Sequence, residues 1–207
     1  PDAELEEQIN SYLSQLSEVL SRTIATTTVD FETRRELMRT GENGFANLAA
    51  DALRKHYNSD VAIINGGGFR ANRHYAAGST ITVGDIQKEL PFNNRVVNIR
   101  VRGRILRKTL ERGLSRIEEV KGCFPHISGM LVTYNPKRPP MQRVVSVMVG
   151  GRELDPEKIY TLTTIDFMAN GGDGFLELKD AERVVKLGET RLLWEYIHNH
   201  IASLGVI

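Results

Sequence analysis

The stretch DVAIINGGGFR, Asp60–Arg70, joins an apolar run to a glycine-rich loop. The run is short and almost entirely apolar, which is typical of a strand buried on both faces. The three glycines after Asn65 let the main chain pass close to a ligand, and Arg70 adds a cation that suits phosphate or carboxylate. The alternative is a surface turn with a solvated arginine. The stretch therefore predicts a buried strand whose end is a candidate binding loop.

The rest of the sequence contains both helical and strand-like patterns. Apolar residues at helical spacing predict helices within 39–58, 83–90, 103–117 and 189–204. Alternating or continuous apolar runs predict strands at 95–103, 129–134, 143–149 and 159–165. This mixture predicts an α+β (mixed α/β) domain.

A further helix is predicted near the N-terminus. Its apolar residues recur at helical spacing and are Leu5, Ile9, Leu13, Leu16 and Leu20. Two interpretations fit this amphipathic pattern: the helix covers the core of the domain, or it links the domain to a preceding one. An extended segment, TIATTTVDF, follows it. Because the sequence begins at Pro1 without a methionine, we expect it to be part of a longer protein.

The composition limits the classes of protein to consider. With 207 residues, 41% hydrophobic and 26% charged, the chain is an ordinary globular sequence long enough for a substantial core. The net charge of +1 gives no reason to expect nucleic-acid binding. No apolar run approaches the roughly 18 residues of a membrane span, so we expect no membrane insertion by this chain. The single cysteine, Cys123, excludes an internal disulfide.

The glycines at Gly66–Gly68 do not form a dinucleotide-binding motif. That motif needs a helix directly after the glycines, so that the helix N-terminus faces the pyrophosphate. Here the following residues, FRANRHYAAGS, have no helical apolar period. The P-loop pattern G-x-x-x-x-G-K-[ST] is also missing from the sequence.

A second candidate loop is DFMANGGDGF, Asp166–Phe175. Asn-Gly-Gly is turn chemistry, and the whole stretch can be read as an ordinary turn. Alternatively, Asp173 accepts hydrogen bonds from sugar hydroxyls, and Phe167 stacks on a base if a second exposed aromatic faces it. Phe92, in LPFNN, is the candidate for that second ring, whereas Phe175 is expected in the core.

Searches for metal sites and nucleophiles give no candidate. The five histidines are His56, His74, His126, His198 and His200, and none lies in a metal-binding motif. No G-x-S-x-G sequence is present, and Cys123 has no evident general base. The sequence thus predicts binding groups but no catalytic residue and no metal ligand.

Several stretches in order resemble the C-terminal substrate-binding domain of the 5'-nucleotidase family, which includes UDP-sugar hydrolases and 2',3'-cyclic phosphodiesterases. They are RTGENGFANLAADALR, AIINGGGFR, GSTITVGDIQKELPFNN, VRGRIL, FPHISGM and DFMANGGDGF. The resemblance covers about residues 30 to 190. It implies a layered helix and sheet domain at 29–207, with 1–28 as a linker helix from a missing N-terminal metallophosphoesterase domain.

The resemblance also implies roles for six residues. Phe92 and Phe167 would enclose the base, and Asp173 would hold the ribose hydroxyls. Arg39 and Arg70 would contact the phosphate side. Asn65 would belong to the same pocket. Phenylalanines at the two ring positions favour a 5'-nucleotidase over the cyclic phosphodiesterase branch, where tyrosines are expected.

The full-length protein implied by the resemblance is a phosphoric-ester hydrolase that splits nucleotides into nucleoside and phosphate. Two divalent metal ions would lie in the N-terminal domain, so this chain alone is expected to hold no cofactor and to be inactive. Its partners would be a nucleotide or nucleoside and the catalytic domain, in a periplasmic, cell-surface or extracellular setting. The alternatives are a stand-alone nucleotide-binding module and a relative that hydrolyses a non-nucleotide ester, such as a thiosulfohydrolase.

Overall fold

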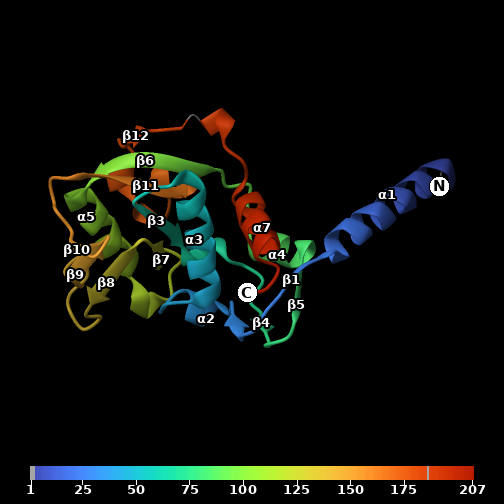
Figure 1. Ribbon diagram of the computed structural model, residues 1–207, viewed down its shortest axis with the longest axis horizontal. Helices are drawn as coiled ribbons and strands as arrows, with labels where there is room; N and C mark the ends of the chain where they lie inside the picture. Colours follow the sequence, from blue (N-terminus) through green and yellow to red (C-terminus); the bar gives the residue numbers. More distant parts are fainter. Residues whose placement is uncertain (1–2, 186) are drawn as a thin grey trace.

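The computed structural model describes residues 3–185 and 187–207. Its central sheet has five strands, which lie in the order β12 (Glu182–Arg183), β6 (Val96–Arg102), β11 (Ile159–Ile165), β3 (Val61–Asn65) and β7 (Pro125–Ser128). β3 and β11 run parallel, and the other neighbouring strands run antiparallel. Helices pack around this sheet (Figure 1). The predicted class of mixed helix and sheet is confirmed.

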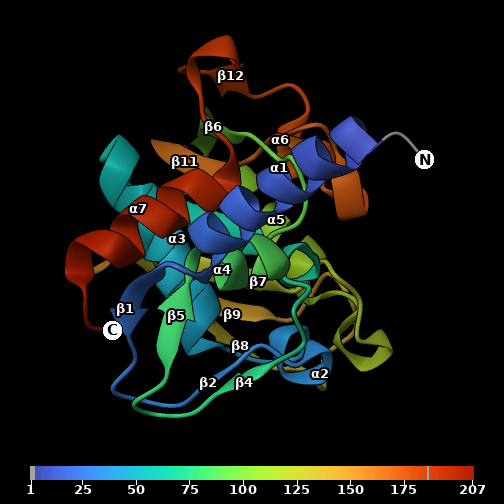
Figure 2. The same cartoon turned by 90° about the vertical axis from the view of Figure 1, so that its right-hand side faces the viewer.

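The helices and the smaller sheets complete the fold. The α-helices are α1 (Ala3–Ser21), α2 (Arg35–Met38), α3 (Gly44–Tyr57), α4 (Val83–Glu89), α5 (Gly103–Leu114), α6 (Asp166–Ala169) and α7 (Leu193–Leu204). A three-stranded sheet contains β10 (Arg152–Glu153), β9 (Val144–Val149) and β8 (Met130–Tyr134) in that order. Two short pairs join β1 (Thr23–Thr26) to β5 (Thr80–Thr82) and β2 (Phe31–Glu32) to β4 (His74–Tyr75) (Figure 2).

β3 is the buried strand that the sequence predicts, since all five of its residues are buried. Helix α3 packs on β3 and β7. The Asn43 side chain caps the start of α3 by accepting hydrogen bonds from the main-chain N–H groups of Phe45 and Ala46. The helix ends before Asn58, which has a left-handed φ of 47°. β3 is thereby held in the core, with its last residue at the edge where the binding loop begins.

The chain from Pro125 to Tyr134 differs from the prediction. The sequence predicts one strand at 129–134, whereas the structure has two strands in different sheets, separated by Gly129. Gly129 has a φ of 78°, and a Cβ there would overlap the Asp60 carbonyl oxygen, so the bend requires glycine. β7 was missed because Pro125 and His126 interrupt its short apolar pattern.

The prediction of a loop for all of Asp166–Phe175 is wrong at its start. Residues Asp166–Ala169 form one helical turn, α6, directly after β11. The Asn170 N–H donates to the Asp166 carbonyl over 2.8 Å, and Gly171 ends the turn with a φ of 90°. A single turn is too short to show an apolar period in the sequence.

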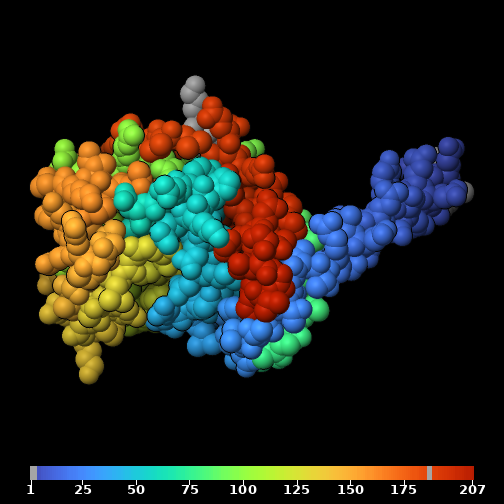
Figure 3. Space-filling view, in the orientation of Figure 1, coloured from blue at the N-terminus to red at the C-terminus, as the bar shows by residue number. Residues whose placement is uncertain are grey.

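Helix α1 forms as predicted but extends away from the rest of the chain (Figures 1 and 3). Its apolar residues Leu5, Ile9, Leu13 and Leu16 are all exposed, so the interpretation that it covers the core of this domain is wrong. Its C-terminal end packs on the body, where Leu20 lies against Gly84 of α4. No helix among the described residues is long and apolar enough to cross a membrane.

Candidate functional site

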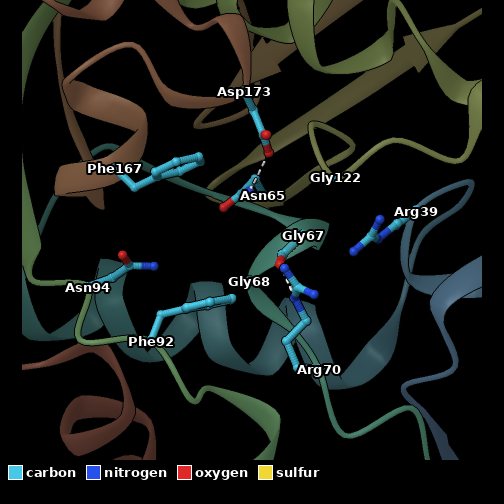
Figure 4. Close-up of a pocket in the computed structure, with 10 residues that line it drawn as sticks. All are labelled: Arg39, Asn65, Gly67, Gly68, Arg70, Phe92, Asn94, Gly122, Phe167 and Asp173. Atoms are coloured by element: carbon cyan, nitrogen blue, oxygen red, sulfur yellow. Dashed lines mark hydrogen bonds between the residues drawn. The ribbon is translucent and has the colours of Figure 1, made fainter.

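The loops that follow β3, α4 and β11 meet around one pocket of about 330 Å³ (Figure 4). All six residues singled out in the sequence line it, together with four others. The lining residues are Arg39, Asn65, Gly67, Gly68, Arg70, Phe92, Asn94, Gly122, Phe167 and Asp173. Residues far apart in the sequence thus converge on one concave site, which is the usual arrangement of a small-molecule pocket.

The glycine-rich loop lies close to a second loop. Gly66–Gly68 form a single 3₁₀ turn that runs into an extended segment, and no α-helix follows it. The Gly67 N–H donates to the Gly122 carbonyl over 2.8 Å, and a Cβ on Gly67 would lie 2.9 Å from the Gly122 Cα. The two main chains therefore pack directly against each other, with glycine required on both sides of the contact.

Two aromatic rings lie on opposite sides of the pocket. Phe92 and Phe167 keep 42% and 41% of their surface exposed although large apolar side chains favour burial. Figure 4 shows the rings facing one another across open space. The guanidinium carbon of Arg70 lies 4.9 Å from the centre of the Phe92 ring, a cation–π distance. The space between the rings suits a flat aromatic group.

Asp173 and Asn65 form a polar pair beside these rings. The Asn65 Nδ2 donates to the Asp173 Oδ2 over 2.7 Å, across 108 positions of sequence. Asn65 is buried, and its Oδ1 has no hydrogen-bond partner among the described residues. Asp173 has a left-handed φ of 52°, a conformation that aspartate tolerates better than most residues. The pair therefore offers hydrogen-bond acceptors to the hydroxyl groups of a ligand.

Arg39 and Arg70 give one end of the pocket a positive charge. Figure 4 places both guanidinium groups away from Asn94, which lies at the other end. Burial lowers the pKa of Arg39, as do its neighbours Arg35 and Arg70, although an arginine stays protonated in proteins. Among the described residues neither Arg39 nor Arg70 has an ion-pair partner. This end of the pocket therefore suits an anion.

Comparisons with known proteins identify the family of the chain. The family model described as "5'-nucleotidase, C-terminal domain" matches residues 23–180. The chain belongs to this family. It is 28% identical over 194 residues to the trifunctional nucleotide phosphoesterase protein YfkN of Bacillus subtilis (strain 168), covering 89% of this chain and 13% of that protein.

Solved structures share the fold of this 5'-nucleotidase C-terminal domain. A 5'-nucleotidase precursor from Thermus thermophilus matches with a TM-score of 0.85 at 31% identity, over 100% of this chain and 41% of that chain. The sulfate thiohydrolase SoxB of the same species matches with a TM-score of 0.77 at 20% identity, over 99% of this chain and 36% of that chain, which shows a common fold alone. The chain spans less than half the length of these proteins.

A buried carboxylate ties the loops of the family domain together. The Oε1 of Glu89 accepts hydrogen bonds from the Thr33 hydroxyl over 2.7 Å and the Tyr75 hydroxyl over 2.9 Å. The Glu89 carbonyl accepts from the Arg70 N–H over 2.8 Å. Burial raises the pKa of Glu89, while these hydroxyl bonds lower it. Phe92 follows Glu89 closely in sequence. Glu89 therefore helps to position both the loop that carries the Phe92 ring and the loop that carries Arg70.

His126 of β7 contacts two segments next to the pocket, the end of α2 and the glycine-rich loop. Its Nε2 is 2.8 Å from the carbonyl oxygen of Met38, the residue before Arg39, and burial lowers its pKa to about 4. The ring is therefore neutral near pH 7, and because a carbonyl only accepts, Nε2 carries the proton. This contact holds the end of α2 against the glycine-rich loop, since a Cβ on Gly66 would lie 3.2 Å from the same Nε2.

Two residues that line the pocket, Asn94 and Gly122, and two that support it, Glu89 and His126, were not given a role from the sequence. Asn94 belongs to the LPFNN stretch, so its neighbour Phe92 is the signal that could have found it. Gly122 reaches the site through a contact with Gly67, and His126 through a contact with the Met38 carbonyl; a single sequence holds no local signal for such distant contacts. Phe175 has no exposed surface, which confirms its prediction as a core residue.

The described residues contain no cluster of metal-ligating side chains. Within 3–185 and 187–207, no group of three His, Cys, Asp or Glu side chains is arranged to hold a metal ion. Cys123 is buried beside the pocket, and burial and the nearby Asp173 carboxylate both raise the pKa of its thiol. A high pKa keeps the thiol protonated and makes it a poor nucleophile.

Proposed function

We propose that this chain is the nucleotide-binding domain of a metal-dependent 5'-nucleotidase, a hydrolase that converts nucleoside 5'-monophosphates or related nucleotides into nucleoside and phosphate. One observation carries the proposal: two exposed rings, an aspartate and two arginines from four separate segments line one pocket, and neither arginine has an ion-pair partner among the described residues. A nucleotide has a matching flat base, hydroxyl-bearing sugar and anionic phosphate.

In the proposed complex the base lies between Phe92 and Phe167. The ribose hydroxyls donate to the Asp173 carboxylate, which Asn65 holds in place. The phosphate lies toward Arg39 and Arg70, which form no ion pair with another side chain in the part of the chain that the structure describes. The pocket thus fixes the nucleoside and orients its phosphate, which lowers the entropic cost of a reaction at that phosphate.

Bond cleavage is assigned to groups outside this chain. In the proposed full-length enzyme, two divalent metal ions in the N-terminal domain would supply an activated water and charge stabilisation at the phosphate. The residues of this chain would bind and orient the substrate without breaking a bond. We further propose a periplasmic, cell-surface or extracellular location, because the family resemblance implies one.

The ring pair gives the first test. Replacing Phe92 or Phe167 by alanine should weaken adenosine binding about 5- to 150-fold, since base–aromatic stacking is worth about 1–3 kcal/mol. Isothermal titration calorimetry measures this loss. Leu176→Ala is the matched control, because Leu176 is 61% exposed on the same loop but lies outside the pocket. Unchanged adenosine affinity in both ring variants would refute the proposal.

The arginines give a second test, which separates binding of the phosphate group from binding of the nucleoside. Arg39→Met should weaken AMP binding about tenfold and leave adenosine binding unchanged, because a hydrogen bond to a charged group is worth about 1.5 kcal/mol or more. Arg35→Met removes a neighbouring positive charge that does not line the pocket and should change AMP affinity little. Equal losses for AMP and adenosine in Arg39→Met would contradict a phosphate contact.

The same titrations test one alternative, and an assay of AMP hydrolysis by the full-length protein tests the other. A relative that acts on a non-nucleotide ester, such as a thiosulfohydrolase, should bind neither AMP nor adenosine. A stand-alone binding module should bind both, yet belong to a protein without metal-dependent hydrolysis of AMP. The facing rings favour a nucleoside ligand over a small inorganic ester, which has no flat group to fill the space between them.

A further inference from the structure

A second cavity, of about 290 Å³, lies at the outer edge of the central sheet. It is bounded by the edge strand β7, by α5 and by β8, the strand that leaves the sheet after Gly129. Its volume is close to the 330 Å³ of the first pocket. The walls are mainly apolar, and include Leu110, Leu114, Phe124, Ile127, Val132 and Tyr134. A cavity of this size and lining is typical of a small-molecule site.

The bend at Gly129 leaves apolar groups on the inner side of β8 only partly covered. Met130, Val132 and Tyr134 alternate with the exposed Leu131 and Thr133, so they face inward from the strand. All three remain partly accessible although they pack against the core. A ligand in the cavity would remove this apolar surface from water, which stabilises binding by about 25 cal/mol per Å².

His126 gives the cavity a buried polar group. Its ring lines the cavity, and only 1% of the residue is exposed. Nε2 carries the proton and donates to the Met38 carbonyl, so Nδ1 has a lone pair. This Nδ1 is buried and has no hydrogen-bond partner among the described residues. An unpaired buried acceptor destabilises the folded chain, and a ligand that donates a hydrogen bond to it would remove this cost.

The remaining polar side chains at the cavity also favour a donor. Glu42 and Asn47 line it, and the Glu42 Oε1 accepts a hydrogen bond from the Asn47 Nδ2 over 2.7 Å. No lysine or arginine lines the cavity among the described residues, so it offers nothing that would bind an anion. This sets it apart from the nucleotide pocket, which is cationic at one end.

We propose that this cavity binds a small uncharged molecule with a flat apolar body and one hydrogen-bond donor, the donor being directed to Nδ1 of His126. The ligand contacts α5 and β8 on its apolar faces. This second site is separate from the nucleotide pocket and does not depend on the function proposed for that pocket. The two are neighbours through His126, whose other nitrogen holds the residue before Arg39.

Indole and 1-methylindole test the proposal, because the methyl group removes the donor and keeps the aromatic body. Calorimetry with the whole chain should show indole binding about fivefold tighter, the value of one hydrogen bond of about 1 kcal/mol. Absence of indole binding up to its solubility limit would overturn the proposal. Equal affinity of the two compounds would also overturn it.

Two variants locate the bound probe. Val132→Phe and Ile127→Phe should fill the cavity and weaken indole binding at least tenfold, because both side chains line the cavity and are only partly buried. Near-ultraviolet circular dichroism checks the fold of each. The double variant Phe92→Ala, Phe167→Ala should retain indole binding. Loss of binding in that double variant, or unchanged binding in both filling variants, would place indole elsewhere and refute the site.

Discussion

Replacing Gly66 by alanine is expected to lower the free energy of unfolding by about 3 kcal/mol or more. A Cβ at this position would overlap the carbonyl oxygen of Met38 and lie 3.2 Å from Nε2 of His126. Met38 and His126 are fully or almost fully buried, and the overlap is with main chain. Relief of the overlap requires α2 and the glycine-rich loop to separate, since no flexible side-chain end can move aside.

Urea denaturation of the Gly66→Ala variant measures this loss. Gly41→Ala is the matched control, because Gly41 follows the same helix α2 and an added Cβ there meets no atom within 4 Å. The control should change stability by no more than about 0.5 kcal/mol. Because Arg39 follows Met38, AMP affinity should also fall in Gly66→Ala. Equal stability of the two alanine variants would show that the described contact between Gly66 and Met38 is wrong.

The stability of the chain is expected to depend on pH through His126. Its pKa is about 4 in the folded chain and 6.5 in the unfolded one, so the unfolded state binds the proton more tightly. This contribution is fully present above pH 6.5 and is lost as the pH falls toward 4. Between pH 7 and pH 4 the loss amounts to about 3 kcal/mol.

His126→Gln isolates this contribution from the other titrating groups. The glutamine amide nitrogen can still donate to the Met38 carbonyl, but it does not titrate. The difference in unfolding free energy between the wild type and His126→Gln should therefore shift by about 3 kcal/mol between pH 7 and pH 4, against the wild type. Denaturant titrations at a series of pH values give this difference. A difference that stays constant with pH would mean that folding does not lower the pKa of His126.

The main elements of the fold could be predicted because their patterns are local. β3 is a continuous apolar run, and the apolar spacing in α3 and α5 repeats over several turns. β7 and α6 could not be predicted, since each has only four residues and depends on partners distant in sequence. The orientation of α1 also lies outside local information, because an amphipathic pattern does not say what covers the apolar side.

The residues of the candidate site could be predicted, whereas the contacts among them could not. The sequence singled out six residues, and all six line the first pocket. Their roles remain predictions that the titrations above test. The contact of Asn65 with Asp173 and the support from Glu89 and His126 join strands and loops far apart in sequence, and no local pattern reports such contacts.

Helix α1 is long compared with the part of it that packs on the rest of the chain. Its 19 residues span about 28 Å at 1.5 Å per residue, while Leu20 packs against Gly84 at the C-terminal end of the helix. A tilt of about 10° at that end displaces the far end by about 5 Å, given this length. A small change in the packing of Leu20 against α4 would thus move the opposite end of the helix by more than the diameter of a water molecule.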